Sequence, residues 1–281
     1  MFKRISNVQV RAIKLLNKNT LPVKGEKLIT NPYSNVFICA RKRSGKTCLI
    51  AKILRSCTDR KTHVVIICST AHKDATYQVI IQKLRKRGIT VDVFDSLLEG
   101  KRSIIDDIID NYEPYEDQQS EDDEEQDDEP IEKPPAVCDF GECSEPEDDL
   151  APSKPKRKPW KRKKLAPDLC IVLDDMGTQL RHKSVGDFMK KNRHFKCLTL
   201  VSSQYPQDLS RQSFKNLDRF IAFQGHSKEK MKEIHTRLDI SFKFDKFYEM
   251  YKTATEKKYN FLYVDVEDDR DIRKNFNDRF I

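Results

Sequence analysis

The tetrapeptide Ser-Gly-Lys-Thr at residues 44 to 47 places a cation and a hydroxyl in one short loop directly after the apolar run NVFICA. In loops of this kind, backbone N–H groups surround the β- and γ-phosphates of a nucleotide, and the lysine ammonium reaches the same oxygens. The threonine hydroxyl joins the Mg²⁺ shell. We therefore expect a nucleotide site. Its binding residues are Arg43, Ser44, Gly45, Lys46, Thr47 and Cys48.

The loop departs from the usual pattern at its first position, where Ala40 stands in place of glycine. Glycine there permits a tight exit from the strand, and alanine suffices where φ is negative. A Gly-Lys-Thr in another context is more often ordinary sequence, but here a buried strand precedes it and a helix follows. Arg41, Lys42 and Arg43 add positive charge for contact with phosphate, DNA or a neighbouring subunit.

Two adjacent carboxylates, Asp174 and Asp175, end the apolar run in LCIVLDDMG. Carboxylates at the end of a buried strand are costly unless a cation or hydrogen-bond donors stabilise them. Asp174 suits Mg²⁺ ligation, directly or through water, and Asp175 suits polarising the water that attacks a γ-phosphate. The alternative is a solvated turn, because DDMG has good turn chemistry.

The run LTLVSSQ ends in Ser202, Ser203 and Gln204. Open α/β sheets bind ligands at the carboxyl ends of their strands, so a polar side chain there can sense the γ-phosphate or hold the attacking water. We assign that role to Gln204. The alternative is a helix cap or a turn.

Three basic residues follow in LSRQSFKNLDRF: Arg211, Lys215 and Arg219. Each is eligible to act across a subunit boundary as a cation that stabilises the charge of the transition state. For each one, a surface ion pair or a DNA phosphate contact is the more common role, and the sequence does not choose among them.

Apolar, β-rich runs alternate with helical patterns on both sides of a charged middle segment. This alternation predicts an α/β fold, a mainly parallel sheet with crossover helices, and the near-continuous apolar runs predict that the strands are buried on both faces. The expected strands are 35–40, 63–69, 90–95, 168–175, 197–204, 219–224 and 260–266. The expected helices are 45–57, 74–87, 181–193, 227–238 and 244–255.

The net charge of +8 over 281 residues hides an uneven distribution. Residues 113 to 149 hold 18 acidic residues and one lysine, and the rest of the chain carries a net charge of +25. The first property predicts a disordered insertion at 111–165, acidic and then basic. The second predicts a nucleic-acid partner. The ATPase domain then comprises residues 34–110 and 166–281, after an N-terminal segment at 1–33.

The basic run KPKRKPWKRKK at residues 154 to 164 has three interpretations that stay open. It can neutralise the acidic run before it, contact nucleic-acid phosphates or act as a nuclear-import signal. An acidic segment can also occupy a DNA-binding channel, so the insertion is a candidate autoinhibitory element.

The eight cysteines lie mostly in apolar runs, which favours free thiols in a reducing compartment. Cys138 and Cys143 have no second pair of suitable spacing nearby, so we expect no zinc site there. No apolar run approaches the roughly 20 residues of a membrane-spanning helix, and the first residues lack a signal peptide's apolar core.

Taken together, the motifs RSGKT, CSTAHKD, IVLDDMG, LVSSQ, FKNLDRFIAF and NFLYVDV resemble those of the FtsK/HerA superfamily of P-loop ATPases. The likeness spans about residues 34–110 and 166–280, and it is greatest to the poxvirus-type genome-packaging ATPases of large DNA viruses and virophages. By matching position, the resemblance implies Walker A roles for Lys46 and Thr47, Walker B roles for Asp174 and Asp175, and a sensor role for Gln204. Ala40 and the charged insertion depart from the family pattern.

The resemblance implies a RecA-like P-loop NTPase fold, with helices on both faces of the sheet. It also implies Mg²⁺-dependent ATP hydrolysis that drives double-stranded DNA into a preformed viral capsid, usually through a homo-oligomeric ring, often a hexamer. The implied partners are DNA and capsid or portal-vertex proteins. The implied place is the host cell interior at sites of virion assembly, or the virion itself. Two alternatives stay open: a helicase or DNA-pumping ATPase unrelated to capsids, and a non-catalytic DNA-binding or capsid-associated protein.

Overall fold

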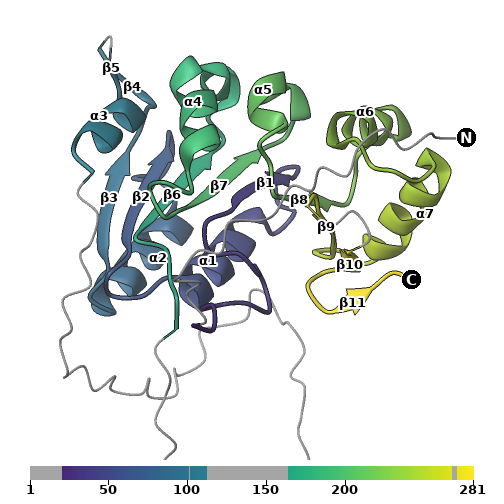
Figure 1. Ribbon diagram of the computed structural model, residues 1–281, viewed down its shortest axis with the longest axis horizontal. Helices are drawn as coiled ribbons and strands as arrows, with labels where there is room; N and C mark the ends of the chain where they lie inside the picture. Colours follow the sequence, from purple (N-terminus) through teal and green to yellow (C-terminus); the bar gives the residue numbers. More distant parts are fainter. Residues whose placement is uncertain (1–20, 101, 113–163, 268–270) are drawn as a thin grey trace, which may run out of the picture. The chain divides into compact units, whose positions relative to one another are not determined.

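A nine-stranded sheet lies at the centre of the computed structural model, which describes residues 21–100, 102–112, 164–267 and 271–281 (Figure 1). The strand order is β11-β10-β9-β8-β1-β7-β6-β2-β3. The strands are β1 (Asn35–Cys39), β2 (His63–Cys68), β3 (Thr90–Phe94), β6 (Leu169–Asp174), β7 (Cys197–Ser203), β8 (Arg219–Phe223), β9 (Phe261–Asp265), β10 (Ile272–Lys274) and β11 (Asp278–Arg279).

Six neighbouring strands, from β3 to β8 in the order above, are parallel, and β9, β10 and β11 continue the sheet in antiparallel pairing. Strand β7 pairs with β1 on one side and β6 on the other, so one strand separates the loop after β1 from the carboxylates at the end of β6. Because parallel strands end at the same edge, all three chemistry-bearing segments meet there.

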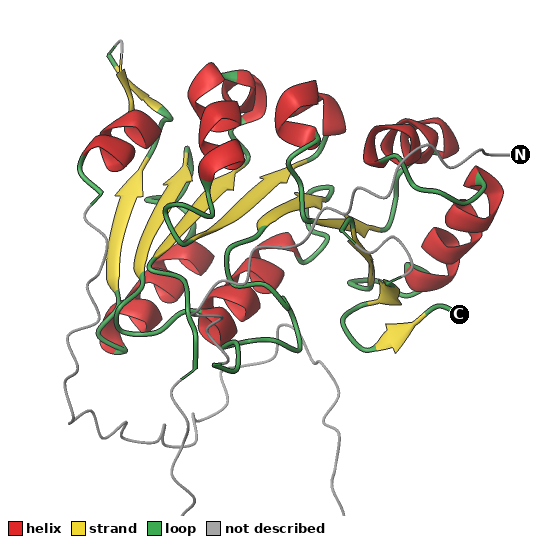
Figure 2. Cartoon of the chain, viewed as in Figure 1, coloured by secondary structure: helices red, strands yellow, loops and turns green. Residues whose placement is uncertain are grey.

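Helices cover both faces of the sheet (Figure 2). On one face lie α1 (Lys46–Cys57) and α2 (Ala75–Lys86), which bury side chains against Val36 and Ile38 of β1. The opposite face packs against the remaining helices. They are α3 (Ile104–Asp110), α4 (Lys183–Lys191), α5 (Arg211–Phe214), α6 (Lys228–Leu238) and α7 (Phe244–Ala254).

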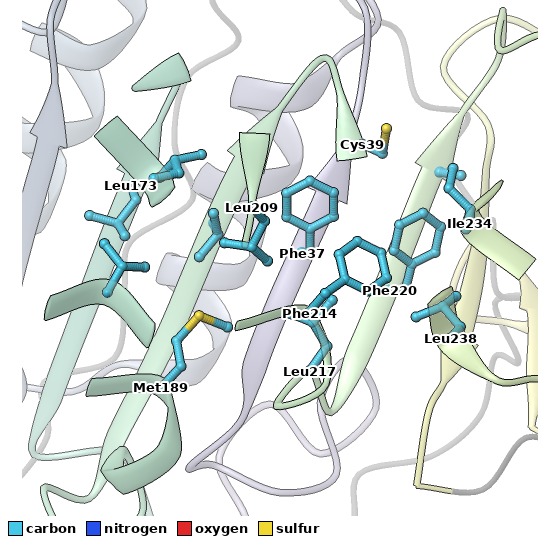
Figure 3. Packing of buried hydrophobic residues seen from close by; sticks show 14 of the residues in the cluster. Phe37, Cys39, Leu173, Met189, Leu209, Phe214, Leu217, Phe220, Ile234 and Leu238 are labelled. Atoms are coloured by element: carbon cyan, nitrogen blue, oxygen red, sulfur yellow. The ribbon is translucent and has the colours of Figure 1, made fainter. Parts of the chain in front are cut away.

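The core on the α5 face is aromatic where the central strands meet that helix. Figure 3 shows Phe37 of β1 and Phe220 of β8 beside Phe214 of α5, with ring centroids of Phe37 and Phe214 5.8 Å apart. Strand residues alternate between the two faces, so Phe37 and Cys39 belong to this core and Ile38 to the other. The strands are buried on both faces, as their near-continuous apolar runs predict.

Each of the seven expected strands is present with both ends within one residue of the expected position, and the predicted α/β fold is confirmed. The helix expected at 181–193 is present as α4, which is two residues shorter at each end, and a 3₁₀ turn, η1 (Gly177–Arg181), precedes it. The short elements were not predicted from the sequence. These are the β4 (Leu98–Glu99) and β5 (Arg102–Ser103) hairpin, α3, the 3₁₀ turn η2 (Pro206–Asp208), α5, β10 and β11.

The expected insertion at 111–165 falls almost wholly outside the described residues, as do Cys138, Cys143 and residues 1–20. Its proposed disorder and autoinhibition therefore stay predictions. Within the N-terminal segment, Pro22 and Lys24 exchange backbone hydrogen bonds of 2.8 Å with Leu165, and Ile29 is buried. Among the described residues, no helix has the length and apolarity to cross a membrane.

Candidate nucleotide site

The loop between β1 and α1 has the backbone conformation that its sequence predicts. Ala40 has a negative φ and donates its N–H to the Ser203 carbonyl at 3.0 Å, so the alanine fits the strand exit without strain. Arg43 and Gly45 take left-handed conformations, with φ of 61° and 96°. Glycine suits the second position because a Cβ on Gly45 would lie 3.2 Å from the Tyr259 ring.

Exposure differs along this loop. Residues 44 to 47 are half-buried, whereas Arg41, Lys42, Arg43 and Cys48 are exposed. The Ser44 hydroxyl is buried and has no hydrogen-bond partner among the described residues. The loop therefore presents cations to solvent beside a more enclosed Gly-Lys-Thr segment.

The Lys46 ammonium lies between the two predicted carboxylates. Its Nζ is 2.8 Å from Asp174 Oδ1 and 2.6 Å from Asp175 Oδ2, and only 11% of the side chain is exposed. Burial lowers the pKa of Lys46, but the two carboxylates outweigh it, so the pKa is raised above its ordinary value. Lys46 is therefore charged at neutral pH, and its present partners are anionic oxygens.

Backbone geometry brings the two carboxylates to Lys46. Asp174 is the last residue of β6 and pairs in register with Ser202 of β7. Asp175 then turns into a left-handed conformation with φ of 52°, and its N–H donates to the Ser202 carbonyl at 3.1 Å. Aspartate tolerates this conformation better than most residues. The result is one buried carboxylate, 4% exposed, and one at the surface, 40% exposed.

Tyr77 belongs to the site, although the sequence analysis did not select it. Its hydroxyl donates to Asp174 Oδ2 at 2.6 Å, and the residue is 1% exposed. Burial and then the Asp174 carboxylate raise the pKa of Tyr77. The available signal was its place in the first turn of α2, directly after strand β2, but only the pairing of β2 with β6 connects that turn to Asp174.

The end of β7 supplies three polar residues to the same edge. The Ser202 hydroxyl is fully buried beside Asp174 and has no hydrogen-bond partner among the described residues. Ser203 instead donates to Asp208, a local turn contact. Gln204 is half-buried just beyond the strand, and Lys230 donates to its backbone carbonyl.

The donor set fits Mg²⁺ bound together with phosphate. Thr47 and Asp174 offer hard oxygens, and the described residues contain no group of three or more His, Cys, Asp or Glu that could hold a metal alone. Magnesium commonly binds through one or two protein oxygens, with phosphate oxygens and waters completing the shell. A metal at this edge would therefore arrive with a nucleotide.

The three basic residues that were eligible to act across a subunit boundary lie in different surroundings. Arg211 and Lys215 are exposed on and directly after α5, and Lys215 lines a cavity of ≈ 410 Å³ with Asn35, at the edge where the parallel strands begin. Arg219 is 2% exposed and its Nη1 is 2.8 Å from Asp265. Since a cation that reaches a neighbouring subunit must be exposed, this geometry favours a structural role for Arg219.

A mainly parallel α/β sheet, with a Gly-Lys-Thr loop between a central strand and the following helix, defines a P-loop NTPase-like fold. No family model and no curated protein sequence matches the chain.

Solved structures of genome-packaging NTPases are similar to the chain. One is the genome-packaging NTPase B204 from Sulfolobus turreted icosahedral virus 2 in complex with AMP, with TM-score 0.49, 15% identity, and coverage of 86% of this chain and 96% of that one. Another is B204, the DNA-packaging ATPase from Sulfolobus turreted icosahedral virus, with TM-score 0.49, 16% identity, and coverage of 86% and 97%. At this sequence identity and TM-score, the similarity does not show an activity for this chain.

Proposed function

We propose that the chain is an ATP-hydrolysing translocase that packages viral double-stranded DNA into a preformed capsid. The observation that supports the ATPase part is the position of Lys46 Nζ, within 2.8 Å of both Asp174 and Asp175. Loop and carboxylates come from segments about 130 residues apart in sequence and meet at one sheet edge. The packaging part rests on the resemblance of the motifs to genome-packaging ATPases.

In this proposal the phosphates of ATP replace the carboxylates as partners of Lys46. The ammonium is already charged and belongs to the first residue of α1, so exchange of partners requires movement of one flexible side chain. The loop N–H groups and Lys46 then bind the β- and γ-phosphates. Arg43, Ser44, Gly45 and Cys48 complete the lining of the loop.

Thr47 and Asp174 would hold Mg²⁺, which would neutralise charge on the phosphate oxygens. Asp175, the more exposed carboxylate, orients the attacking water and accepts its proton. Gln204 detects the presence of the γ-phosphate. Its backbone carbonyl accepts from Lys230 of α6, which gives a physical route from the strand end to that helix.

DNA binding follows from charge. The chain outside residues 113 to 149 carries a net charge of +25, which favours a polyanion as partner. A ring of identical subunits would let Arg211 or Lys215 approach a neighbour's nucleotide. Capsid or portal-vertex proteins are the expected further partners, inside the host cell at sites of virion assembly.

Translocation without unwinding distinguishes the proposal from a helicase. The purified chain, supplied with ATP and Mg²⁺, should displace a third strand from a triplex on duplex DNA but leave a forked duplex paired. Strand displacement on the fork would favour the helicase alternative. Failure to move on either substrate, with no ATP hydrolysis, would favour the non-catalytic alternative.

A further inference from the structure

The Tyr77 hydroxyl is a buried donor aimed at the carboxylate that is proposed to hold the metal. It lies 2.6 Å from Asp174 Oδ2, and both residues are at most 3% exposed. Tyr77 reaches this position because β2 pairs with β6 in register, with Cys68 opposite Asp174, and α2 begins a few residues after β2 ends. The contact is therefore fixed by the central sheet rather than by a surface loop.

Each oxygen of Asp174 has its own partner. Lys46 Nζ forms an ion pair with Oδ1 at 2.8 Å, and Tyr77 donates a hydrogen bond to Oδ2. The two partners differ in freedom, because the lysine is a flexible chain whose ammonium can move to phosphate, while the tyrosine ring is enclosed in the core between α2 and the sheet. When Lys46 turns to the phosphates, Tyr77 remains.

We propose that Tyr77 is a positioning residue, whose hydroxyl holds Asp174 Oδ2 so that Oδ1 faces the metal that arrives with the nucleotide. This inference rests on the proposed ATPase function. A hydrogen bond to the oxygen that does not face the metal fixes the carboxylate plane, and partners of this kind tune metal affinity. Packing alone does not require the hydroxyl, since a phenylalanine ring fills the same space.

The chain supplies a matched control. Tyr263 of β9 is also 1% exposed and belongs to the same core face, but its hydroxyl makes no hydrogen bond to any described residue. Tyr77→Phe and Tyr263→Phe thus remove the same atom from equally buried rings. Only the first removes a contact to Asp174.

The test measures Mn²⁺ affinity of the full chain saturated with a non-hydrolysable ATP analogue, by the electron paramagnetic resonance signal of free Mn²⁺. Analogue affinity without metal is measured in parallel. Tyr77→Phe should weaken Mn²⁺ binding by about 10- to 100-fold. Analogue affinity without metal should stay within about twofold, and Tyr263→Phe should match the unaltered chain in both. Circular dichroism verifies that each variant is folded.

Three results would overturn the inference. Unchanged Mn²⁺ affinity in Tyr77→Phe, with normal analogue binding, would remove the positioning role and leave the proposed function intact. An equal loss in Tyr263→Phe would show a general effect of a missing buried hydroxyl. Absence of any Mn²⁺–nucleotide binding by the unaltered chain would overturn the proposed function and this inference with it.

A double variant tests whether Tyr77 affects the metal through Asp174 alone. If Tyr77 acts only through Asp174, then Tyr77→Phe should cause no further loss of Mn²⁺ affinity in an Asp174→Asn background. An additive loss would mean that Tyr77 affects the metal by another route and would contradict the proposal.

Discussion

The two edges of the central sheet both bury a cation beside carboxylates, but they treat it differently. At the edge where the parallel strands begin, Arg219 Nη1 is 2.8 Å from Asp265, and Nη2 donates to Thr30 at 2.9 Å. At the edge where these strands end, the ion-pair partners of Lys46 among the described residues are the two adjacent carboxylates.

The two cations differ in how easily they can exchange their partners for others. The guanidinium of Arg219 is planar and is also held by the Asp218 carbonyl at 2.7 Å, in a cluster that includes Glu267. The ammonium of Lys46 is a compact charge on a flexible stem. Beside its partner Asp174 lies the buried Ser202 hydroxyl, which has no hydrogen-bond partner in the part of the chain that the structure describes. We infer that the first edge contributes to stability and that the second is arranged to accept a ligand.

The largest effect is expected from Lys46→Ala. Removing the ammonium deletes the charge that binds the phosphates, so nucleotide binding should be lost and turnover should fall by about 100- to 1000-fold or more. Binding of a fluorescent ATP analogue measures the first effect. Lys52→Ala, an exposed lysine on the same helix, is the matched control and should bind normally. Normal binding by Lys46→Ala would contradict the assignment.

The next largest effect is expected on ATP hydrolysis, with no change in ATP binding. Asp175→Asn keeps the shape of the side chain but removes the base that accepts the proton of the attacking water. Turnover should fall by about 100- to 10,000-fold while ATP affinity is retained. Single-turnover hydrolysis and equilibrium binding separate the two quantities. If Asp175→Asn hydrolyses ATP at the normal rate, the base is another group.

Arg219→Ala tests whether the edge where the parallel strands begin contributes to stability. It removes the cation that lies 2.8 Å from the buried Asp265, so the free energy of unfolding should fall by about 3 to 5 kcal/mol. Urea denaturation measures this loss. The same change at the exposed Arg211 should alter stability by less than about 0.5 kcal/mol. A stable Arg219→Ala protein with impaired DNA-stimulated turnover would reverse the comparison and return Arg219 to a catalytic role between subunits.

A smaller, pH-dependent effect on stability is expected from His226, which contacts the end of strand β1 at the edge where the parallel strands end. Its Nε2 donates to the Cys39 carbonyl at 3.1 Å, and burial, followed by the charge of Lys230 and then that of Arg41, lowers its pKa to about 4. Between pH 6.5 and 4 the unfolded chain binds this proton and the folded chain does not. Stability is therefore lost as pH falls through this window.

His226→Gln should remove that dependence. Glutamine can donate to the same carbonyl but does not titrate, so its stability between pH 7 and 4.5 should decline by about 2 to 3 kcal/mol less than that of the unaltered chain. Thermal unfolding across this range measures the difference. If the stabilities of His226→Gln and of the unaltered chain decline equally over this range, folding does not lower the pKa of His226.

The sequence predicts those parts of the fold that depend on local signals. Continuous apolar runs predicted the central strands. The Ser-Gly-Lys-Thr segment, between an apolar run and a helical pattern, predicted the loop. Asp174 and Asp175 were predicted at the sheet edge because a strand ends there. These inferences need only the rule that parallel strands finish at a common edge.

Long-range pairing determined what the sequence did not predict. Tyr77 reads as an ordinary aromatic on the apolar face of a helix, and only the neighbourhood of β2 and β6 brings its hydroxyl to Asp174. Arg219 reads as a surface charge, but antiparallel pairing of β8 with β9 places Asp265 directly opposite and allows burial. Strands of two or three residues, such as β10 and β11, are too short for an apolar alternation to stand out.

We infer that this sheet edge hydrolyses ATP in response to DNA, and phosphate release by the full chain with Mg²⁺ measures this activity. Double-stranded DNA should stimulate the hydrolysis, and Lys46→Ala should abolish it. Because phosphate contacts carry the DNA affinity, the stimulation should weaken as salt rises. No hydrolysis with or without DNA, or hydrolysis that persists unchanged in Lys46→Ala, would contradict it.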